Sequence, residues 1–183
     1  MNRERLLMLV EIAIFAAIGI ILDMLSFSLP QGGSVSFVMV PIVLMAMRWG
    51  IGAGLVTGLL IGVLQMVLGP KIYHWAQALL DYGFAFTAVG LAAVVRQPLL
   101  TALAGMNKVK IAIYVSIGAI IGGLLRYFVH TLSGVVFFSE YAGDQNVWVY
   151  SIVYNGSYML PAIILTAVVC AFLFTASPKL LKR

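Results

Sequence analysis

Charge and cysteine are scarce in this 183-residue sequence, and each shortage excludes a class of protein. Lys, Arg, Asp and Glu together make up 9% of the chain, whereas about 25% is usual for a soluble domain. With 63% hydrophobic residues, the composition excludes an ordinary soluble domain and favours an integral membrane protein. The single cysteine, Cys170, excludes a disulfide framework and a cysteine-based metal site.

Motifs for catalysis and nucleotide binding are also absent. The sequence contains no HExxH, no GxSxG and no P-loop for ATP, and its carboxylates are not paired at a useful spacing. We therefore predict that the chain is not an enzyme and has no metal or cofactor, and that partners or a gradient supply any energy for transport. The net charge of +5 does not predict nucleic-acid binding, because the basic residues flank apolar segments instead of gathering on one soluble face.

Apolar runs predict an all-α bundle of six transmembrane helices in a single domain, residues 1–183. A straight span needs about 20 apolar residues. Five runs approach or exceed this length, at residues 6–29, 51–68, 75–95, 111–138 and 147–176. The first is too long for a signal peptide and is expected to be retained. The remaining helix, 35–47, is expected to be short, oblique or packed inside the bundle, and 96–110 to be a linker.

The basic residues predict the orientation of the chain in a cell membrane. If the N-terminus is cytoplasmic, Lys71 falls on an outer loop and Arg126 within a helix. The other basic residues then lie on the cytoplasmic side: Arg3, Arg5, Arg48, Arg96, Lys108, Lys110, Lys179, Lys182 and Arg183. This asymmetry follows the positive-inside rule. Six crossings also keep the basic C-terminus in the cytoplasm.

Five polar side chains interrupt the expected helices at a similar depth, in the outer third of the bilayer: Asp23, Asp81, Arg126, His130 and Asn155. Ionisable residues within a membrane are costly and are functional candidates by default. Their common depth predicts a binding pocket open to the outside. Two simpler interpretations stand beside it: Arg126 and Asp81 also fit a structural ion pair, and for Asp23 we favour a residue that caps its helix or faces the outer loop.

Helical spacing places these polar residues in stripes. Arg126 and His130 are four residues apart and share one face. Two further stripes are His74, Gln77 and Asp81, and Tyr150, Tyr154 and Tyr158. Aromatic residues gather near the expected outer mouth, where they also fit an interfacial belt: Tyr73, Trp75, Tyr82, Phe137, Phe138 and Trp148. Carboxylate, amide and aromatic groups together suit a flat, cationic heteroaromatic ligand.

Several separated motifs, taken in order, resemble the thiamine-specific substrate-binding (S) component of energy-coupling factor transporters. The resemblance runs from about residue 11 to 182. The motifs are Pro30-Gln31-Gly32-Gly33-Ser34-Val35-Ser36, Arg48-Trp49-Gly50, Gln77-Ala78-Leu79-Leu80-Asp81-Tyr82, Arg126-Tyr127-Phe128-Val129-His130 and Tyr150-Ser151 followed by Asn155-Gly156.

The resemblance implies a six-helix, multi-pass protein that captures thiamine with high affinity near the outer face and does not hydrolyse ATP. Its expected partners are thiamine, the lipid bilayer, a shared transmembrane coupling protein and two ATPase subunits. Such components are thought to topple in the membrane to release their substrate inside. In this resemblance Ala13 and Ala17 match a small-residue motif for docking on the coupling protein.

The resemblance also implies eight substrate-binding residues, which match the family pattern: Asp81, Tyr82, Arg126, His130, Tyr150, Asn155, Tyr73 and Phe138. At Phe138 the family has a stacking tryptophan, and a second family tryptophan in the first outer loop has no counterpart here. That loop, Gln31, Gly32, Gly33 and Ser34, is the expected lid, because glycine permits large changes in backbone dihedral angles.

The residues suggest how thiamine, a permanent cation, is held. We expect Asp81 to supply the opposing charge or a hydrogen bond, and His130 and Phe138 to stack on a ring. Tyr150 and Asn155 are expected to hydrogen-bond the pyrimidine edge. Arg126 is expected to pair with Asp81 or Tyr82, or to reach the hydroxyethyl end of the ligand.

Two alternative functions stay open from the sequence. One is an S component for another vitamin, such as riboflavin. The other is a self-contained secondary transporter of an organic cation, which would need an ion relay continuing to the cytoplasmic side. The inner halves of the expected helices lack acids for such a relay.

Overall fold

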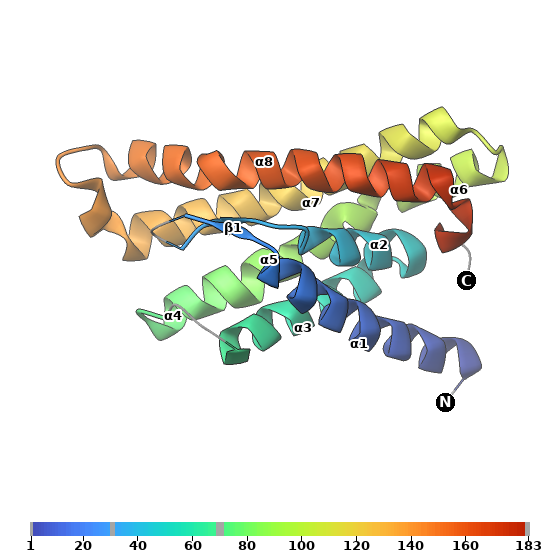
Figure 1. Ribbon diagram of the computed structural model, residues 1–183, viewed down its shortest axis with the longest axis horizontal. Coiled ribbons are helices and arrows are strands. Elements are labelled where there is room, and N and C mark those ends of the chain that lie inside the picture. The colour runs from blue at the N-terminus through green and yellow to red at the C-terminus, as the bar shows by residue number, and fades with distance from the viewer. Residues whose placement is uncertain (1, 30–31, 69–71, 182–183) are drawn as a thin grey trace.

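The computed structural model describes residues 2–29, 32–68 and 72–181, and in these ranges the chain is almost entirely helical (Figure 1). The long helices are α1 (Arg3–Met24), α3 (Ile51–Leu68), α7 (Lys108–Phe137) and α8 (Val147–Ala176). A shorter helix, α2, spans Met39–Trp49, and two 3-10 turns lie at Ser139–Ala142 and Pro178–Leu181. Strands β1 (Phe27–Ser28) and β2 (Ser34–Val35) form an antiparallel hairpin after α1.

A further long helical run, Trp75–Ala104, changes its winding several times. Its parts are α4 (Trp75–Ala78), a π-helical segment (Leu79–Phe84), α5 (Ala85–Val89), a 3-10 segment (Gly90–Val95) and α6 (Arg96–Ala104). The prediction of a linker over 96–110 was therefore wrong for most of its length. Pro98 is tolerated because it lies in the first turn of α6, where backbone N–H groups have no partner in the helix.

Five of the described helices are long and apolar enough to cross a membrane. Helix α2 has only 11 residues, which corresponds to about 17 Å at 1.5 Å per residue. All its residues from Met39 to Met47 are buried. The helix therefore lies inside the bundle, which is one of the arrangements expected from its short apolar run.

The first helix ends earlier than the sequence predicted. Helix α1 stops at Met24, where residue 29 was expected. Phe27 pairs with Val35 and Ser28 with Ser34 in the hairpin. The apolar run therefore continues beyond the end of α1, but its last residues form strand β1, which is hydrogen-bonded to β2.

Glycines on α3 let it pack directly on the backbone of the run that begins at Trp75. A Cβ atom on Gly58 would lie 2.2 Å from the carbonyl oxygen of Phe86, and one on Gly62 would lie 1.8 Å from that of Tyr82. Both distances are far below van der Waals contact, so a side chain at either position would push the helices apart. This approach holds the π-helical segment, which carries Asp81 and Tyr82, against α3.

The end of the bundle away from the hairpin is held by an ion pair between α1 and α2. Nε of Arg48 donates to Glu11 at 2.6 Å, and Nε1 of Trp49 donates to the same carboxylate, also at 2.6 Å. Arg48 also donates to the carbonyl oxygen of Leu180, near the end of the described chain. Helix α1 therefore begins and the last turn ends at the same end of the molecule (Figure 1).

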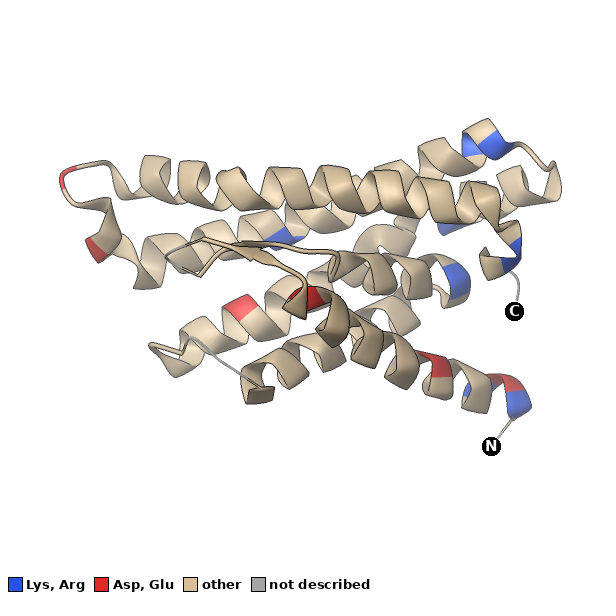
Figure 2. Cartoon of the chain, in the orientation of Figure 1, with Lys and Arg blue, Asp and Glu red and all other residues tan. Residues whose placement is uncertain are grey.

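Lys and Arg gather at this same end (Figure 2). Acidic residues also lie within the bundle and in the turns at the opposite end. Among the described basic residues Arg126 is the exception, because it is buried on α7. The charge pattern thus divides the bundle into a basic end and an end that carries the hairpin.

Candidate ligand-binding site

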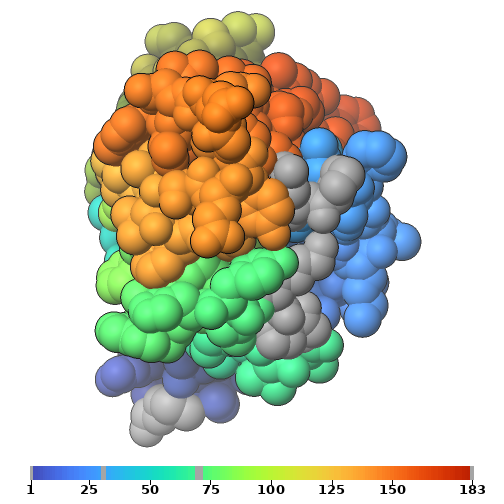
Figure 3. All heavy atoms as spheres, turned by 90° about the vertical axis from the view of Figure 1, so that its left-hand side faces the viewer, coloured from blue at the N-terminus to red at the C-terminus, as the bar shows by residue number. Residues whose placement is uncertain are grey.

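A cavity of about 380 Å³ opens toward the end of the bundle that carries the hairpin. Figure 3 views this end, where the hairpin, the start of α4 and the connection from α7 to α8 all face the viewer. The cavity is lined from α1, the hairpin, α3, the run from Trp75, α7 and α8. All eight predicted binding residues contribute to its lining: Tyr73, Asp81, Tyr82, Arg126, His130, Phe138, Tyr150 and Asn155.

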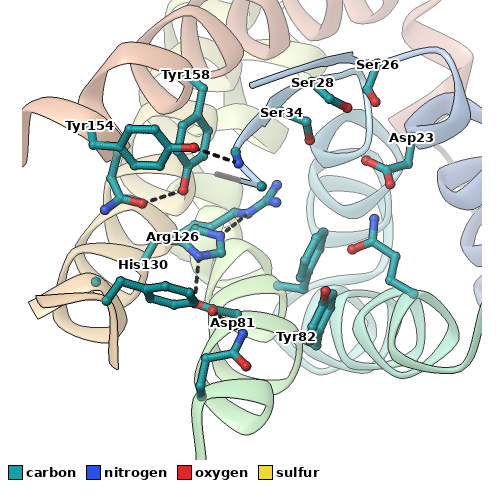
Figure 4. A pocket seen from close by; sticks show the side chains of 18 of the residues that line it. Asp23, Ser26, Ser28, Ser34, Asp81, Tyr82, Arg126, His130, Tyr154 and Tyr158 are labelled. Carbon is teal, nitrogen blue, oxygen red and sulfur yellow. Dashed lines mark hydrogen bonds and ion pairs between the residues drawn. The ribbon is translucent and has the colours of Figure 1, made fainter. Parts of the chain in front are cut away.

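Asp81, His130 and Arg126 form a hydrogen-bonded chain at the base of the cavity (Figure 4). Nε of Arg126 lies 3.2 Å from Nε2 of His130, and Nδ1 of His130 lies 3.0 Å from Oδ1 of Asp81. The Arg126 group can only donate, so Nε2 must accept. His130 therefore carries its proton on Nδ1, donates it to Asp81 and is neutral.

This arrangement bears on one of the roles expected of Arg126. Among the described residues no direct ion pair joins Arg126 to Asp81; Arg126 reaches Asp81 through His130. Contact between Arg126 and the hydroxyethyl end of a ligand stays a prediction. The Arg126 guanidinium also lies 3.9 Å from the ring centroid of Phe86, in cation–π geometry. Sequence spacing predicted that Arg126 and His130 share one helix face, but it did not predict the hydrogen bond between them.

The π-helical segment presents Asp81 to this chain. Gln77, four residues earlier on the same predicted stripe, donates to Oδ2 of Asp81 at 2.7 Å. His74 departs from that stripe, because it caps the start of α4 by accepting from the backbone of Ala76 and stacks on Phe137. It does not line the cavity. π-helical turns occur frequently at functional sites.

Helix α8 contributes a column of tyrosines. Tyr150 and Tyr154 stack with ring centroids 5.9 Å apart, and Tyr158 meets Tyr154 edge-on. Asn155 lies beside this column, where it accepts from the Tyr158 hydroxyl and donates to the carbonyl oxygen of Ser151 at 2.9 Å. Its amide protons are thus already engaged, and one lone pair of its oxygen stays available to a ligand.

Aromatic residues from two connections meet at the mouth. Phe138 packs edge-on against Tyr73 at 5.4 Å between ring centroids, and also against Tyr141. A hydrogen bond with Tyr73 raises the pKa of the Tyr141 hydroxyl above its ordinary value, so this hydroxyl stays protonated at neutral pH. Tyr141 lines the cavity but was not among the predicted site residues. The one sequence signal for Tyr141 is its position shortly after Phe137 and Phe138 at the end of α7.

The hairpin covers one side of the cavity. Gly32, Gly33 and Ser34 of the predicted lid line it, and Gln31 lies outside the described residues. The backbone N–H of Gly33 donates to the Tyr154 hydroxyl at 3.2 Å. A Cβ on Gly33 would lie 2.3 Å from the Tyr158 ring. The hairpin therefore rests directly on the tyrosine column of α8.

The sequence identified the polar wall beneath the hairpin only in part: Ser34 was a predicted lid residue and Asp23 one of the five polar candidates, but Ser26 and Ser28 were not predicted. Figure 4 shows Asp23 together with Ser26, Ser28 and Ser34. Asp23, which sequence reasoning favoured as a cap or loop-facing residue, lines the cavity and accepts from the Ser36 hydroxyl at 3.0 Å. Serines in a loop carry no depth signal, which is why only the folded hairpin reveals this wall.

The lining as a whole suits a flat organic cation. Aromatic faces from four segments surround two carboxylates, and the volume lies within the range of about 300–1,000 Å³ usual for small-molecule sites. Among the described residues no cluster of three or more His, Cys, Asp or Glu side chains could hold a metal ion. Charged groups, hydrogen-bonding groups and aromatic faces are what this lining offers to a ligand.

Comparison with known proteins gives one consistent result. Residues 9–182 match the family described as "Thiamine transporter protein". The Bacillus subtilis thiamine transporter ThiT is 44% identical, with 100% of this chain and 98% of the relative covered. The ThiT of Lacticaseibacillus paracasei is 36% identical over 98% of this chain and 92% of the relative. A solved structure of ThiT from Listeria monocytogenes, 32% identical, superposes with a TM-score of 0.93 over 99% of this chain and 100% of its own.

Proposed function

Because this chain belongs to the thiamine transporter protein family, we propose that it captures thiamine at the outer face of the cell membrane. It then delivers thiamine as the S component of an ATP-driven uptake complex. The chain is a multi-pass membrane protein and acts in transport, not as an enzyme. The cavity carries this proposal, because its lining combines aromatic faces, carboxylates and an ordered set of hydrogen-bonding groups at one end of the bundle.

The hydrogen-bonded chain at the base of the cavity suits the aminopyrimidine ring. Asp81 accepts one bond at each oxygen, from His130 and Gln77, and retains lone pairs for the ligand's amino group. The protonated Nδ1 of His130 is committed to Asp81, so its ring face is the part offered to the ligand. Asn155 contributes its remaining acceptor site and orients the Tyr158 hydroxyl.

The mouth residues enclose the other faces of the ligand. Phe138, held edge-on by Tyr73, provides an apolar ring where the family has tryptophan. Tyr82 and Tyr150 complete the aromatic lining on neighbouring helices. The hairpin with Gly32, Gly33 and Ser34 acts as the lid. It must leave the tyrosine column for thiamine to enter and return to it afterwards.

The chain crosses the membrane six times, with both termini in the cytoplasm. The five long helices provide five crossings. Helix α2, preceded by the extended residues of β2, provides the sixth inside the bundle, where protein shields it from lipid. The basic end of the molecule is then the cytoplasmic one, as the positive-inside rule requires, and the cavity opens outward.

Thiamine titration of the purified protein tests the proposal. In detergent, saturable binding with a Kd below 1 μM is expected, and mass spectrometry of the untreated preparation is expected to find thiamine. Riboflavin at the same concentrations is expected to produce no signal. Riboflavin binding without thiamine binding would reassign the ligand, and thiamine uptake into liposomes by this chain alone would favour a self-contained secondary transporter.

Docking on the coupling protein uses the outer face of α1. Ala13 and Ala17 are both exposed there, while Ile12 and Ala16 on the neighbouring face are buried. Small residues four apart let another helix approach closely. The sequence lacks a P-loop, so the coupling protein and two ATPase subunits supply the energy.

Enlarging Ala17 separates binding from transport. Ala17→Trp is expected to leave thiamine affinity within about twofold, because the residue lies outside the cavity, and to reduce energised uptake by at least tenfold, because the helices no longer fit. Uptake of labelled thiamine by cells that express the complete complex measures this. Val168→Trp, on the exposed face of α8, is the control and is expected to transport normally. Normal uptake by Ala17→Trp would place the docking surface elsewhere.

A further inference from the structure

Helix α1 carries the proposed docking residues but packs on the bundle through a narrow surface. A smaller share of α1 is buried than of the other long helices. Its buried residues form one stripe, Ile12, Ala16 and Gly19, in which two of the three are small. Small residues let α1 approach its neighbours closely, but they form no high ridge that interlocks with a groove on the next helix. Packing alone therefore fixes the rotation of α1 about its own axis weakly.

A set of hydrogen bonds near the basic end of the bundle fixes α1 instead. Both carboxylate oxygens of Glu11 accept from Arg48, one from Nε at 2.6 Å and the other from Nη2 at 2.8 Å. Trp49 adds a third bond from Nε1 at 2.6 Å. We call these three residues the clasp. A carboxylate held by both arms of a guanidinium is fixed in direction as well as in position, so α1 cannot rotate or slide without breaking the clasp.

The α2 side of the clasp is anchored to further segments. Gly50 ends α2 with a φ of 107°, in the left-handed region that favours glycine. Arg96, the first residue of α6, donates to the carbonyl oxygens of Met47 at 2.9 Å and Arg48 at 3.0 Å. Arg48 itself reaches the carbonyl oxygen of Leu180 at 3.0 Å. The clasp thus ties α1 to the end of α2, the start of α6 and the last 3-10 turn.

The clasp and the docking residues lie on opposite sides of the buried stripe of α1. At 3.6 residues per turn, Glu11 falls on one edge of the stripe, and Ala13 and Ala17 fall on the other. A rotation of α1 that exposed Glu11 would also turn the two alanines away from their present direction. A carboxylate without a partner is costly within a membrane, so such rotations are disfavoured.

We propose that Glu11 is a positioning residue for transport: through Arg48 and Trp49 it fixes the rotation of α1, so that Ala13 and Ala17 face the coupling protein. This inference rests on the proposed function, in which α1 docks on that protein. None of the three clasp residues is among the described residues that line the cavity. The clasp therefore serves docking and energised uptake, and not the capture of thiamine.

Replacing Glu11 with leucine removes the clasp. Glu11→Leu is expected to keep thiamine affinity within about twofold in detergent, which also shows that the variant is folded, and to lower the maximal rate of energised uptake at least fivefold, because the small-residue face is no longer held toward its partner. The melting temperature is expected to fall, since Arg48 loses its carboxylate partner. Uptake of labelled thiamine is measured in liposomes that contain the complete complex.

A double variant separates positioning from stability. Glu11→Leu combined with Arg48→Met removes both charges, and apolar replacement of a buried ion pair is about neutral for stability. Its melting temperature is expected to return close to that of the unsubstituted protein, while uptake stays at least fivefold low because nothing fixes the rotation of α1. Uptake that recovered together with the melting temperature would show that the clasp only stabilises the fold, and would overturn the inference.

Glu4→Leu is the matched control, because it makes the same substitution at an exposed acid in the first turn of the same helix, and it is expected to transport normally. Normal uptake by Glu11→Leu would overturn the inference. So would a loss of thiamine affinity that matched the loss of uptake, since the clasp would then serve the whole fold. Failure of the unsubstituted protein to bind thiamine, or of its complex to take it up, would contradict the proposed function itself.

Discussion

Replacing Asp81 with alanine is expected to weaken thiamine binding at least a hundredfold, which corresponds to about 3 kcal/mol. The substitution removes the acceptor for the pyrimidine amino group. It also leaves His130 without the partner that orients it, and removes one of the two carboxylates that offset the charge of Arg126 beside a cationic ligand. Removing one member of a buried charge network is among the costliest polar substitutions. Isothermal titration with thiamine in detergent measures the loss.

A second variant separates lost recognition from lost folding. Asp81→Asn keeps the size of the side chain and is expected to lose affinity while its melting temperature stays close to that of the unsubstituted protein. Asp144→Ala, an exposed acid in the turn before α8, is the control and is expected to bind normally. If Asp81→Ala bound thiamine like the unsubstituted protein, the π-helical segment would not belong to the recognition surface.

Placing valine at position 33 is expected to weaken thiamine binding at least tenfold, mainly through faster release. Gly33 is buried, and a Cβ there would lie 2.3 Å from the Tyr158 ring. The hairpin would have to lift away, which would also break the bond from its backbone to the Tyr154 hydroxyl. Overpacking of this kind costs about 1–3 kcal/mol. Stopped-flow fluorescence of bound and released thiamine measures the two rates.

The control for this variant is a glycine with free space around it. A Cβ on Gly52, in α3, would meet nothing within 4 Å, so Gly52→Ala is expected to leave both rates unchanged. The melting temperature of Gly33→Val should change little, because the hairpin packs on the bundle from outside. Unchanged release from Gly33→Val would mean that the hairpin does not close over the ligand.

The membrane character and the long helices followed from the sequence because both depend on local composition. Runs of about 20 apolar residues form helices in lipid regardless of their neighbours. The five long helices accordingly lie close to the predicted ranges. The ends of two segments did not follow this rule. The end of the first apolar run pairs as a strand instead of continuing the helix. Residues 96–104, expected to be a linker, form a helix that has Pro98 in its first turn.

Candidate site residues were also recognisable in sequence, because polar side chains are conspicuous where lipid is the solvent. Asp81, Arg126, His130 and Asn155 were singled out in this way, and the structure brings them around one cavity. Their roles toward thiamine stay predictions. Helical spacing gives the face of each residue but not its partner, so the bond between Arg126 and His130 and the engagement of Asn155 were not foreseen.

The sequence by itself therefore determined that this protein lies in a lipid membrane, where its long helices are and which polar residues are costly to bury. Only the tertiary structure decided how those residues share their charges. The hydrogen-bonded chain of Arg126, His130 and Asp81 depends on the contact between α7 and the π-helical segment. The exposure of Asp23 to the cavity depends on the hairpin that follows α1. Electrostatic balance is set by distances of a few ångströms between segments far apart in the chain, and those distances exist only in the fold.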